Sequence, residues 1–376
     1  MCFDHALLLS WSRCDEGLHE FQATTQYHLH YSRKVGYLHD GMTARQHTTE
    51  LLWRFPVNIM SLITRFMTLI GAAVSGAFAW RLLQPEIVQR APSRFLACAL
   101  PTSDGRPPVA LVTGASAGIG QAFAHRLARS GYALVLVARR SGRLEALADA
   151  LQRQHAVEVQ PLVADLAALD DIERVASVAA DLSESGWLDL LINNAGFGTV
   201  GDYADLPLQS QLDMLNVHVT TAMSLTKAAL PGMLRRRRGG IVNVASTAGW
   251  YPLPGNATYS ATKRFLINFS ESLQSELDGT GVCVQALCPG FTYSEFHDTA
   301  AYRASGFRRE RLPRFMWQTA EQVVEASLNA LGREVVCIPG MHNRAVTAMR
   351  AFVPRAILGQ VWRRMGPGEP RSAPRD

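Results

Sequence analysis

Lysine is scarce in this chain of 376 residues, in which three lysines stand against 34 arginines. Composition alone therefore does not account for a lysine that falls inside a motif. The formal net charge is +5, yet residues 301–376 alone carry 13 arginines against six acids, so the first 300 residues sum to −2. A basic tail suits an acidic surface such as phospholipid headgroups or nucleic acid, and a solvated Arg-rich face is the alternative.

Paired cysteines are also missing, because none of the six cysteines forms a CxxC pair or lies at zinc-ligand spacing from histidines. A chain of this length needs no disulfide staples, so we expect reduced thiols. Four histidines cluster early without ordered cysteine or acidic partners: His28, His30, His39 and His47. We therefore expect no metal site.

The one G-x-S-x-G match, Gly114–Gly118, belongs to a longer glycine-rich loop, Thr113–Gly120, and this context argues against a Ser-His hydrolase. We accordingly interpret His218 and His297 as ordinary histidines. Long uncharged runs are absent too. The uncharged stretch Phe66–Trp80 is shorter than the ~20 residues of a spanning helix, and extending it back to Phe55 includes Arg65.

The chain divides into five parts by composition. Residues 1–54 show no period of 2 or 3.6 and stay unassigned; Met42 and Met60 are alternative starts, so membership of residues 1–59 in the mature chain is left open. Residues 55–83 predict a hydrophobic helix that is a membrane anchor, an uncleaved signal-like helix or a helix packed on the core. Residues 84–107, with four prolines, predict a linker. Residues 108–341 and 342–376 follow as catalytic domain and C-terminal segment.

Seven short apolar runs alternate with helix-like segments from Val109 onward: VALVTG, ALVLVAR, VQPLVAD, LDLLINNAG, GGIVNVAS, CVQALCPG and EVVCIPG. Continuous Val/Leu/Ile runs are typical of strands buried on both faces of a parallel sheet. Alternating strands and helices imply right-handed crossovers. The sequence therefore predicts an α/β fold: a Rossmann-type, doubly wound, seven-stranded parallel sheet over 108–341.

A glycine-rich loop, Thr113–Gly120, connects the first of these runs to a helix-like segment. Such glycines permit a tight turn and close approach to a pyrophosphate, which the helix N-terminus then binds. The next run ends in Arg139 and Arg140, where an NAD site would place an acid for the ribose. Guanidinium groups pair with phosphate, so we expect NADP(H) as the cofactor.

Four motifs in order make the chain resemble the short-chain dehydrogenase/reductase family: TGxxxGxG at 113–120, NNAG at 193–196, Ser246 with Tyr259-x-x-x-Lys263, and Pro289-Gly290. The resemblance covers residues 108–341. It implies an oxidoreductase, a homodimer or homotetramer, and a cofactor site that includes Tyr259 and Lys263. The remaining implied cofactor residues are Gly114, Ser116, Gly118, Ile119, Gly120, Arg139, Arg140, Asp165, Leu166, Asn193, Ala195, Gly196, Pro289 and Thr292.

Tyr259 and Lys263 are four residues apart on a helix-like stretch, so their side chains share one face. A phenol of pKa ~10 is a poor catalyst at neutral pH unless a nearby cation favours the phenolate, and Lys263 can supply that charge. In the resembled family, Ser246 and Tyr259 hold the substrate carbonyl. Asn216 matches the fourth catalytic member, which anchors a water that relays protons to the lysine.

Residues 291–318 are polar and aromatic without strand or helix periodicity, and in the resembled family this stretch forms a lid over the substrate. Its apolar residues predict a lipophilic pocket unless they only pack the lid on the core: Phe291, Phe296, Phe307, Phe315, Met316 and Trp317. Its arginines would suit an anionic group beyond that pocket: Arg303, Arg308, Arg309, Arg311 and Arg314. Thr319 to Gln322 predict a capping box that begins a helix.

The C-terminal segment shows apolar residues at three- and four-residue steps from Ala345 to Met365, interrupted by Pro354. An amphipathic helix with Trp362 and several arginines suits a membrane surface. The same stripe could instead close over the substrate cleft or pack on a second subunit. Beyond this helix we expect a disordered tail.

The leading hypothesis is an NADP(H)-dependent reductase or dehydrogenase of a lipophilic carbonyl or alcohol: a 3-oxoacyl thioester, a steroid-like ketone, or a long-chain aldehyde or ketone. We expect it in the cytoplasm, with membrane association left open, and expect no nucleic-acid partner. A non-catalytic, membrane-tethered NADP-binding regulator is the alternative. An extended-type epimerase would need a sugar-nucleotide domain after residue 341, where only a short segment follows.

Overall fold

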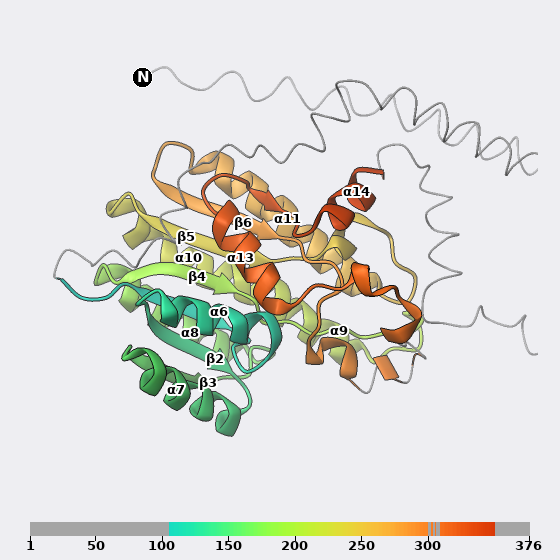
Figure 1. Ribbon diagram of the computed structural model, residues 1–376, viewed down its shortest axis with the longest axis horizontal. Helices are drawn as coiled ribbons and strands as arrows, with labels where there is room; N and C mark the ends of the chain where they lie inside the picture. The colour runs from blue at the N-terminus through green and yellow to red at the C-terminus, as the bar shows by residue number, and fades with distance from the viewer. Residues whose placement is uncertain (1–104, 300–301, 304, 306–308, 350–376) are drawn as a thin grey trace, which may run out of the picture. The chain divides into compact units, whose positions relative to one another are not determined.

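The computed structural model describes residues 105–299, 302–303, 305 and 309–349 (Figure 1). All of them belong to the second of two units into which the chain divides, 1–89 and 90–376. The segments predicted at 1–54 and 55–83, nearly all of the linker, and 350–376 lie outside the described residues. Within the described part of the chain, no helix is long and apolar enough to cross a membrane.

Seven parallel strands form one sheet in the order β3-β2-β1-β4-β5-β6-β7 (Figure 1). Each of the seven apolar runs supplies one strand, so the prediction of a doubly wound, seven-stranded parallel sheet is confirmed. The strands are β1 Val109–Thr113, β2 Ala133–Ala138, β3 Val159–Val163, β4 Leu188–Asn193, β5 Gly239–Val244, β6 Val282–Leu287 and β7 Val336–Cys337.

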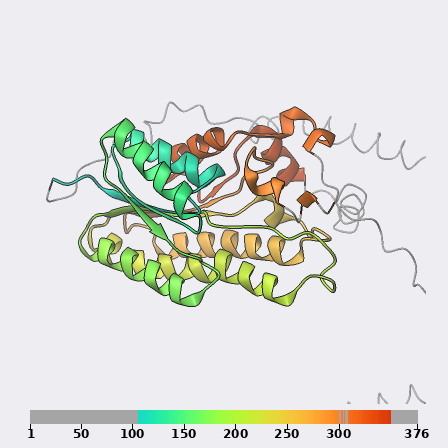
Figure 2. The same cartoon turned by 90° about the horizontal axis from the view of Figure 1, so that it is seen from below.

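Helices cover both faces of the sheet (Figures 1 and 2). One face carries α6 Gly118–Arg129, α7 Ser141–His155 and α13 Ala320–Ala330; the other carries α8 Leu169–Glu184, α10 Thr221–Arg235 and α11 Ala257–Glu276. Side chains of β1 alternate between the two resulting cores, with Val112 in one and Leu111 in the other. The capping box predicted for α13 is present: the N–H of Gln322 donates to Thr319 Oγ1, and the N–H of Thr319 donates to Gln322 Oε1.

Strand β3 differs from the expectation of burial on both faces. Among the described strands it lies at the edge of the sheet and pairs with β2 alone, and Gln160, Pro161 and Val163 are exposed. Pro161 fits this position because a proline lacks the N–H that a second neighbouring strand would require. The run was apolar enough to predict a strand, but its proline and glutamine mark the sheet edge.

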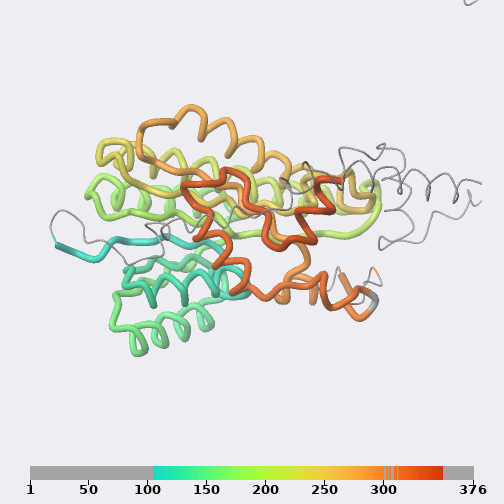
Figure 3. Tube along the Cα trace, turned by 45° about the horizontal axis from the view of Figure 1, so that its top comes forward, coloured from blue at the N-terminus to red at the C-terminus, as the bar shows by residue number. Residues whose placement is uncertain are grey.

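The order of the strands reverses between β1 and β4, and a crevice opens there at the carboxyl ends. Figure 3 shows the segment after β6 and helix α14, Met341–Met349, on this same side of the molecule. The loop that begins at Gly114 returns into α6, and Gly120 lies directly beneath it. A Cβ at Gly120 would lie 2.4 Å from the Gly114 carbonyl oxygen and 2.5 Å from Asn194 Nδ2.

We expect Gly120→Ala to lower the free energy of unfolding by about 1–3 kcal/mol, because the added methyl must displace backbone atoms. Gly142→Ala is the matched control, since Gly142 lies in α7 with no atom within 4 Å of its added Cβ. That variant should be neutral or more stable by up to about 1 kcal/mol. Urea unfolding of both variants measures the difference, and equal stabilities would contradict the packing argument.

Candidate active site

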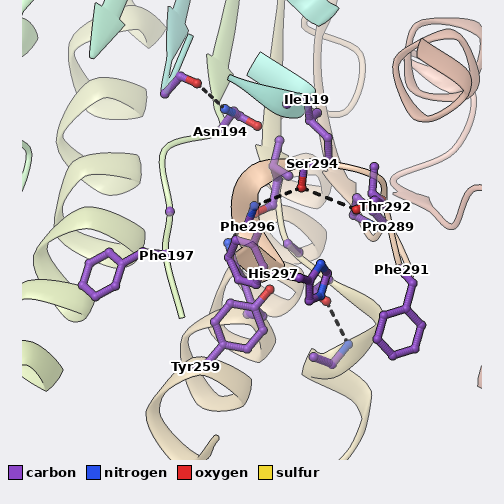
Figure 4. A pocket seen from close by; sticks show the side chains of 18 of the residues that line it. Ile119, Asn194, Phe197, Tyr259, Pro289, Phe291, Thr292, Ser294, Phe296 and His297 are labelled. Carbon is purple, nitrogen blue, oxygen red and sulfur yellow. Dashed lines mark hydrogen bonds between the residues drawn. The ribbon is translucent and has the colours of Figure 1, made fainter. Parts of the chain in front are cut away.

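A cleft of about 730 Å³ opens at the carboxyl ends of the strands. Its lining comes from the loops after β1, β2, β3, β4 and β5, from helix α11, from the segment 291–318 and from α14. Figure 4 shows Tyr259, Phe296 and His297 close together in the cleft, with Ile119 and Asn194 farther along it. The cleft therefore has a nucleotide half at the glycine loop and a substrate half beneath the lid.

The nucleotide half is built from backbone. Gly114 has φ +66°, and a Cβ there would lie 2.9 Å from the Ala195 Cα, so only glycine fits. The Asn194 amide donates to the Thr113 carbonyl at 2.8 Å, while Thr113 Oγ1 accepts from the N–H groups of Asn194 and Ala195. These bonds join the loop after β4 to the loop after β1. The N-terminus of α6 then faces a cradle suited to a pyrophosphate.

Cationic groups lie at the far end of this half, where the loops after β1 and β2 meet. Arg140 donates through Nη2 to Ser116 Oγ at 3.0 Å and through Nε to the same hydroxyl at 3.2 Å. Arg139 lies 3.8 Å from Asp165 and is mostly exposed. Exposed guanidinium groups beside a ribose position can accommodate a phosphate, whereas no carboxylate follows β2 to hold a free 2′-hydroxyl.

Most of the sequence-predicted site residues line the cleft. They are Gly114, Ser116, Gly118, Ile119, Arg139, Arg140, Asp165, Leu166, Ala195, Gly196, Ser246, Tyr259, Lys263, Pro289 and Thr292. Gly120, Asn193 and Asn216 do not line it. Gly120 supports the loop from below.

Asn193 lies beneath the cleft, and its neighbour Asn194 lines the cleft instead. Asn193 is the last residue of β4 and is 6% exposed, with Nδ2 donating to Asn243 Oδ1 at 2.8 Å. Successive side chains of a strand point in opposite directions, so the two asparagines of NNAG take different roles. Asn193 joins β4 to β5, and Asn194 joins the two cofactor loops. Sequence reasoning missed Asn194, which the motif itself contained.

The candidate catalytic side chains converge where β5 ends. Ser246 follows that strand, and its Oγ accepts from the N–H of Ala248 at 3.1 Å. Tyr259 and Lys263 lie one turn apart on α11, with Lys263 Nζ 5.7 Å from the centre of the tyrosine ring. Lys263 Nζ donates to the Val244 carbonyl at 2.8 Å, which fixes the helix against the strand end. The predicted Ser-Tyr-Lys set therefore shares one site.

Burial sets the protonation of this pair. It raises the pKa of Tyr259 to about 12, although the Ser246 hydroxyl acts in the opposite direction. Burial also lowers the pKa of Lys263 to about 7. In the protein alone, Tyr259 is thus a neutral phenol. We expected Lys263 to lower the pKa of Tyr259, but burial raises it. A protonated phenol is the form that can donate to a carbonyl oxygen, and Lys263 exchanges protons near neutral pH.

Asn216 begins a π-helical turn, η1 (Asn216–Thr220), between α9 (Leu208–Leu215) and α10. Its Nδ2 donates to the Ala167 carbonyl at 2.9 Å, and its own carbonyl accepts from Thr221 Oγ1 at 2.9 Å. Single π turns inside helices are frequent at functional sites. The side-chain amide of Asn216 is thus engaged by Ala167. The relay of protons to Lys263 through a water anchored by Asn216 stays a prediction.

His218 supports the catalytic helix from the same π turn. Its Nε2 accepts from the N–H of Phe197 at 3.1 Å, so the proton resides on Nδ1 and is donated to Thr262 Oγ1 at 2.8 Å. Burial, followed by repulsion from Lys263, holds the pKa of His218 well below its usual value, in agreement with this neutral tautomer. His218 thus ties the loop after β4 to the turn between Tyr259 and Lys263.

The substrate half is mainly aromatic and aliphatic. Phe291, Phe296, Phe315 and Met316 line it, as predicted, but Trp317 is 7% exposed and stacks on Tyr293 instead of facing the cleft. His297 also lines the cleft, and burial lowers its pKa to about 4. Sequence reasoning assigned no role to this residue, which adds a neutral ring beside Phe296.

The anion site that the lid arginines would form beyond the pocket stays a prediction. None of Arg303, Arg309 and Arg314 lines the cleft, and Arg309 pairs with Asp298 at 2.8 Å. Arg309 therefore holds the lid together. Phe307 and Arg308, and the side chain of Arg311, lie outside the description.

Helix α14 forms one wall of the substrate half. His342, Asn343, Val346 and Thr347 line the cleft, and the Tyr251 hydroxyl donates to the Val346 carbonyl at 2.8 Å. The first part of the predicted C-terminal amphipathic stripe thus closes over the cleft, which was one of its open alternatives. Its remainder, from residue 350, lies outside the described residues.

The lowered pKa of Lys263 makes folding stability pH-dependent. Between pH 7 and about 10, the unfolded chain holds more protons on this amine than the folded protein does, so stability rises with pH. Relative to Lys263→Met, the wild type should gain up to about 1.4 kcal/mol per pH unit from pH 7 to 9. Urea unfolding at three pH values measures this. Lys227→Met at an exposed site is the control, and a Lys263→Met curve parallel to the wild type would contradict the shift.

Comparison with known proteins agrees with this geometry. The sequence profile described as short chain dehydrogenase matches residues 108–303. A very-long-chain 3-oxoacyl-CoA reductase-B of Danio rerio is 30% identical over 256 residues, which are 67% of this chain and 74% of the relative. An "uncharacterized oxidoreductase" of Myxococcus xanthus is 42% identical over 191 residues, which are 50% of this chain and 74% of the relative.

Solved structures give the same result. A short-chain dehydrogenase of Sphingobium yanoikuyae in complex with NADPH has a TM-score of 0.57 at 34% identity, and the match covers 71% of this chain and 99% of that one. A bulky-bulky ketone specific alcohol dehydrogenase of Comamonas testosteroni has a TM-score of 0.55 at 31% identity, covering 66% and 96%. With its glycine loop and its Ser-Tyr-Lys set in one cleft, this chain belongs to the short-chain dehydrogenases, oxidoreductases that act on carbonyl and alcohol groups.

Proposed function

We propose that this chain is an NADP(H)-dependent reductase of lipophilic ketones, with long-chain 3-oxoacyl thioesters as the favoured substrate class. One observation carries the proposal: the protonated Tyr259 lies in a cleft whose substrate half is walled by Phe291, Phe296 and helix α14. Similarity to a very-long-chain 3-oxoacyl-CoA reductase and to a bulky-ketone dehydrogenase supports the substrate class. Steroid-like ketones and long-chain aldehydes are the remaining candidates.

The preference for NADP(H) rests on the nucleotide half of the cleft. Arg139 and Arg140 stand where an NAD site has an acid, and Arg140 is anchored on Ser116 close to the N-terminus of α7. Guanidinium groups and a helix N-terminus both favour a phosphate group. Similarity to structures that contain NADPH or NADP supports the same choice.

The side chains of the site account for the proton chemistry of a reduction. When bound, NADPH supplies the hydride that reaches the carbonyl carbon. Tyr259 and Ser246 donate hydrogen bonds to the carbonyl oxygen, and Tyr259 transfers its proton to that oxygen as negative charge develops. Lys263, with a pKa of about 7, can return a proton to the phenolate at neutral pH.

Tyr259→Phe removes the proton donor and keeps the ring, so we expect the rate of ketone reduction to fall by about 10²–10⁴-fold. NADPH affinity should change little, because the nucleotide half is untouched. Tyr203→Phe is the matched control, since Tyr203 is 58% exposed and does not line the cleft. Steady-state rates with NADPH and a reducible ketone, together with NADPH binding, measure both effects.

A substrate panel tests the proposal as a whole. NADPH and NADH are each offered with 3-oxoacyl-CoA esters of increasing chain length, steroid ketones and bulky ketones. We expect NADPH oxidation that improves with chain length and is weak with NADH. A protein that binds NADPH, reduces none of these compounds and is indifferent to Tyr259→Phe would instead be an NADP-binding regulator.

Membrane association is a separate proposal, supported by the hydrophobic run 55–83 and the basic C-terminal segment 343–376. Because Asn343 and Val346 line the cleft, only the later part of the stripe remains to support it. We expect the full-length chain to float with anionic liposomes at low salt. Recovery in the soluble fraction at low and high salt, unchanged by removal of 343–376, would refute attachment and leave the reductase proposal standing.

A further inference from the structure

A lid residue, Glu295, lies between two cationic side chains of the nucleotide half. Its Oε2 accepts from Arg140 Nη1 at 2.8 Å, and its Oε1 accepts from Arg143 Nη1 at 2.6 Å. Hydrogen bonds from Arg140 and then Arg143 hold the pKa of this carboxyl below its usual value, so the group is ionised at neutral pH. These bonds connect the lid to the start of α7, although Glu295 and Arg140 are 155 positions apart in the sequence.

These two arginines form a site for one anion. Helix α7 begins at Ser141 with no side-chain cap and no acidic residue in its first turn. The N-terminus of a helix with free N–H groups favours negative charge, and Arg140 and Arg143 add to that field. Arg140 and Glu295 both line the same cleft. In this structure the anion at the site is the lid carboxylate.

This inference rests on the proposed use of NADP(H). We infer that Glu295 competes with the 2′-phosphate of the cofactor for Arg140 and Arg143, so that the phosphate displaces Glu295 and releases this end of the lid. A phosphate monoester carries up to two negative charges against one on the carboxylate. Both anions beside one guanidinium would repel each other, so the more highly charged group takes the site.

Displacement of Glu295 would also affect the substrate half, because the next residue, Phe296, lies there. Glu295 begins a short helical turn, Glu295–Asp298, and the ring of the next residue, Phe296, lies 5.6 Å from that of Tyr259. Arg309 pairs with Asp298 at the other end of this turn. The 2′-phosphate therefore decides whether the turn that covers Tyr259 is tied down. Glu295 is a specificity-determining residue, since a cofactor without this phosphate leaves the contact in place.

Glu295 could instead help the phosphate to bind, and this role predicts the opposite change in affinity. If the carboxylate only oriented Arg140 and Arg143 for the phosphate, its removal would loosen both side chains and weaken phosphate binding. Competition instead means that removal tightens binding. The sign of the change in affinity thus separates the two roles.

The experiment measures binding of 2′,5′-ADP and ADP, which differ by the 2′-phosphate, to the full-length protein by calorimetry at low salt. For Glu295→Gln, we expect the Kd of 2′,5′-ADP to fall about three- to tenfold, a modest change because exposed ion pairs are individually weak. The Kd of ADP should stay the same. Glu310→Gln is the matched control, because Glu310 is an exposed lid residue that forms no ion pair with another described residue. Its substitution should change neither Kd.

Hydrogen–deuterium exchange supplies the second readout. In the wild type, 2′,5′-ADP should increase exchange of the peptide that covers 291–298, whereas ADP should not. An unchanged or raised Kd of 2′,5′-ADP in Glu295→Gln, or no increase in exchange, would overturn the inference. Failure to bind 2′,5′-ADP at all would refute the cofactor assignment itself, and lack of turnover in the ketone panel would refute the reductase proposal without touching these binding results.

Discussion

The contact between Lys263 and the end of β5 is the constraint on which the active site depends. Lys263 Nζ donates to the Val244 carbonyl at 2.8 Å, and the side chain is 4% exposed. This bond fixes α11 in rotation, which places Tyr259 one turn away over the cleft. Ser246 follows Val244 by two residues, so the same strand end positions both Ser246 and Tyr259. The hydrogen bond from Lys263 thus fixes the positions of the site residues, and the burial of Lys263 and Tyr259 sets their pKa values.

Burial also explains why the two halves of the cleft differ in character. Around Lys263 and Tyr259, burial shifts the pKa values of both groups toward their neutral forms. Around Arg139, Arg140 and Glu295, the side chains are about half exposed, and the guanidinium groups stay charged. Proton transfer needs the first environment, and recognition of a phosphate needs the second. Two neighbouring lid residues contact the two environments: Glu295 binds Arg140, and Phe296 lies beside Tyr259.

The fold was predictable because its signals are local and repeated. Each apolar run became a strand, and the glycine loop met the helix that followed it. Most residues that line the cleft were predictable for a related reason, since the motifs carry them at fixed spacing. Asn193 and Asn194 show the limit: both belong to one motif, and only the alternation of side chains at the end of β4 decides which one reaches the cleft.

Contacts between distant segments were not predictable from the sequence. The pairing of Glu295 with Arg140 joins residues 155 positions apart, and no motif marks either partner for the other. The lid arginines were expected to suit an anionic group, and no motif showed that Arg309 pairs with Asp298 within the lid. Helix α14 carried an amphipathic pattern, but the pattern alone did not show that Asn343 and Val346 line the cleft. Such choices depend on tertiary packing.

The scarcity of lysine acquires a physical meaning at this site. Arginine cannot be deprotonated in proteins, so an arginine at position 263 would place a permanent charge at a buried position. Lysine can lose its proton when buried, and the pKa of Lys263 falls to about 7. In a chain that uses arginine almost everywhere else, the exposed roles of Arg139 and Arg140 tolerate a fixed charge, whereas a proton exchanger beside Tyr259 does not. A buried cationic side chain that must titrate near neutrality is therefore a lysine here.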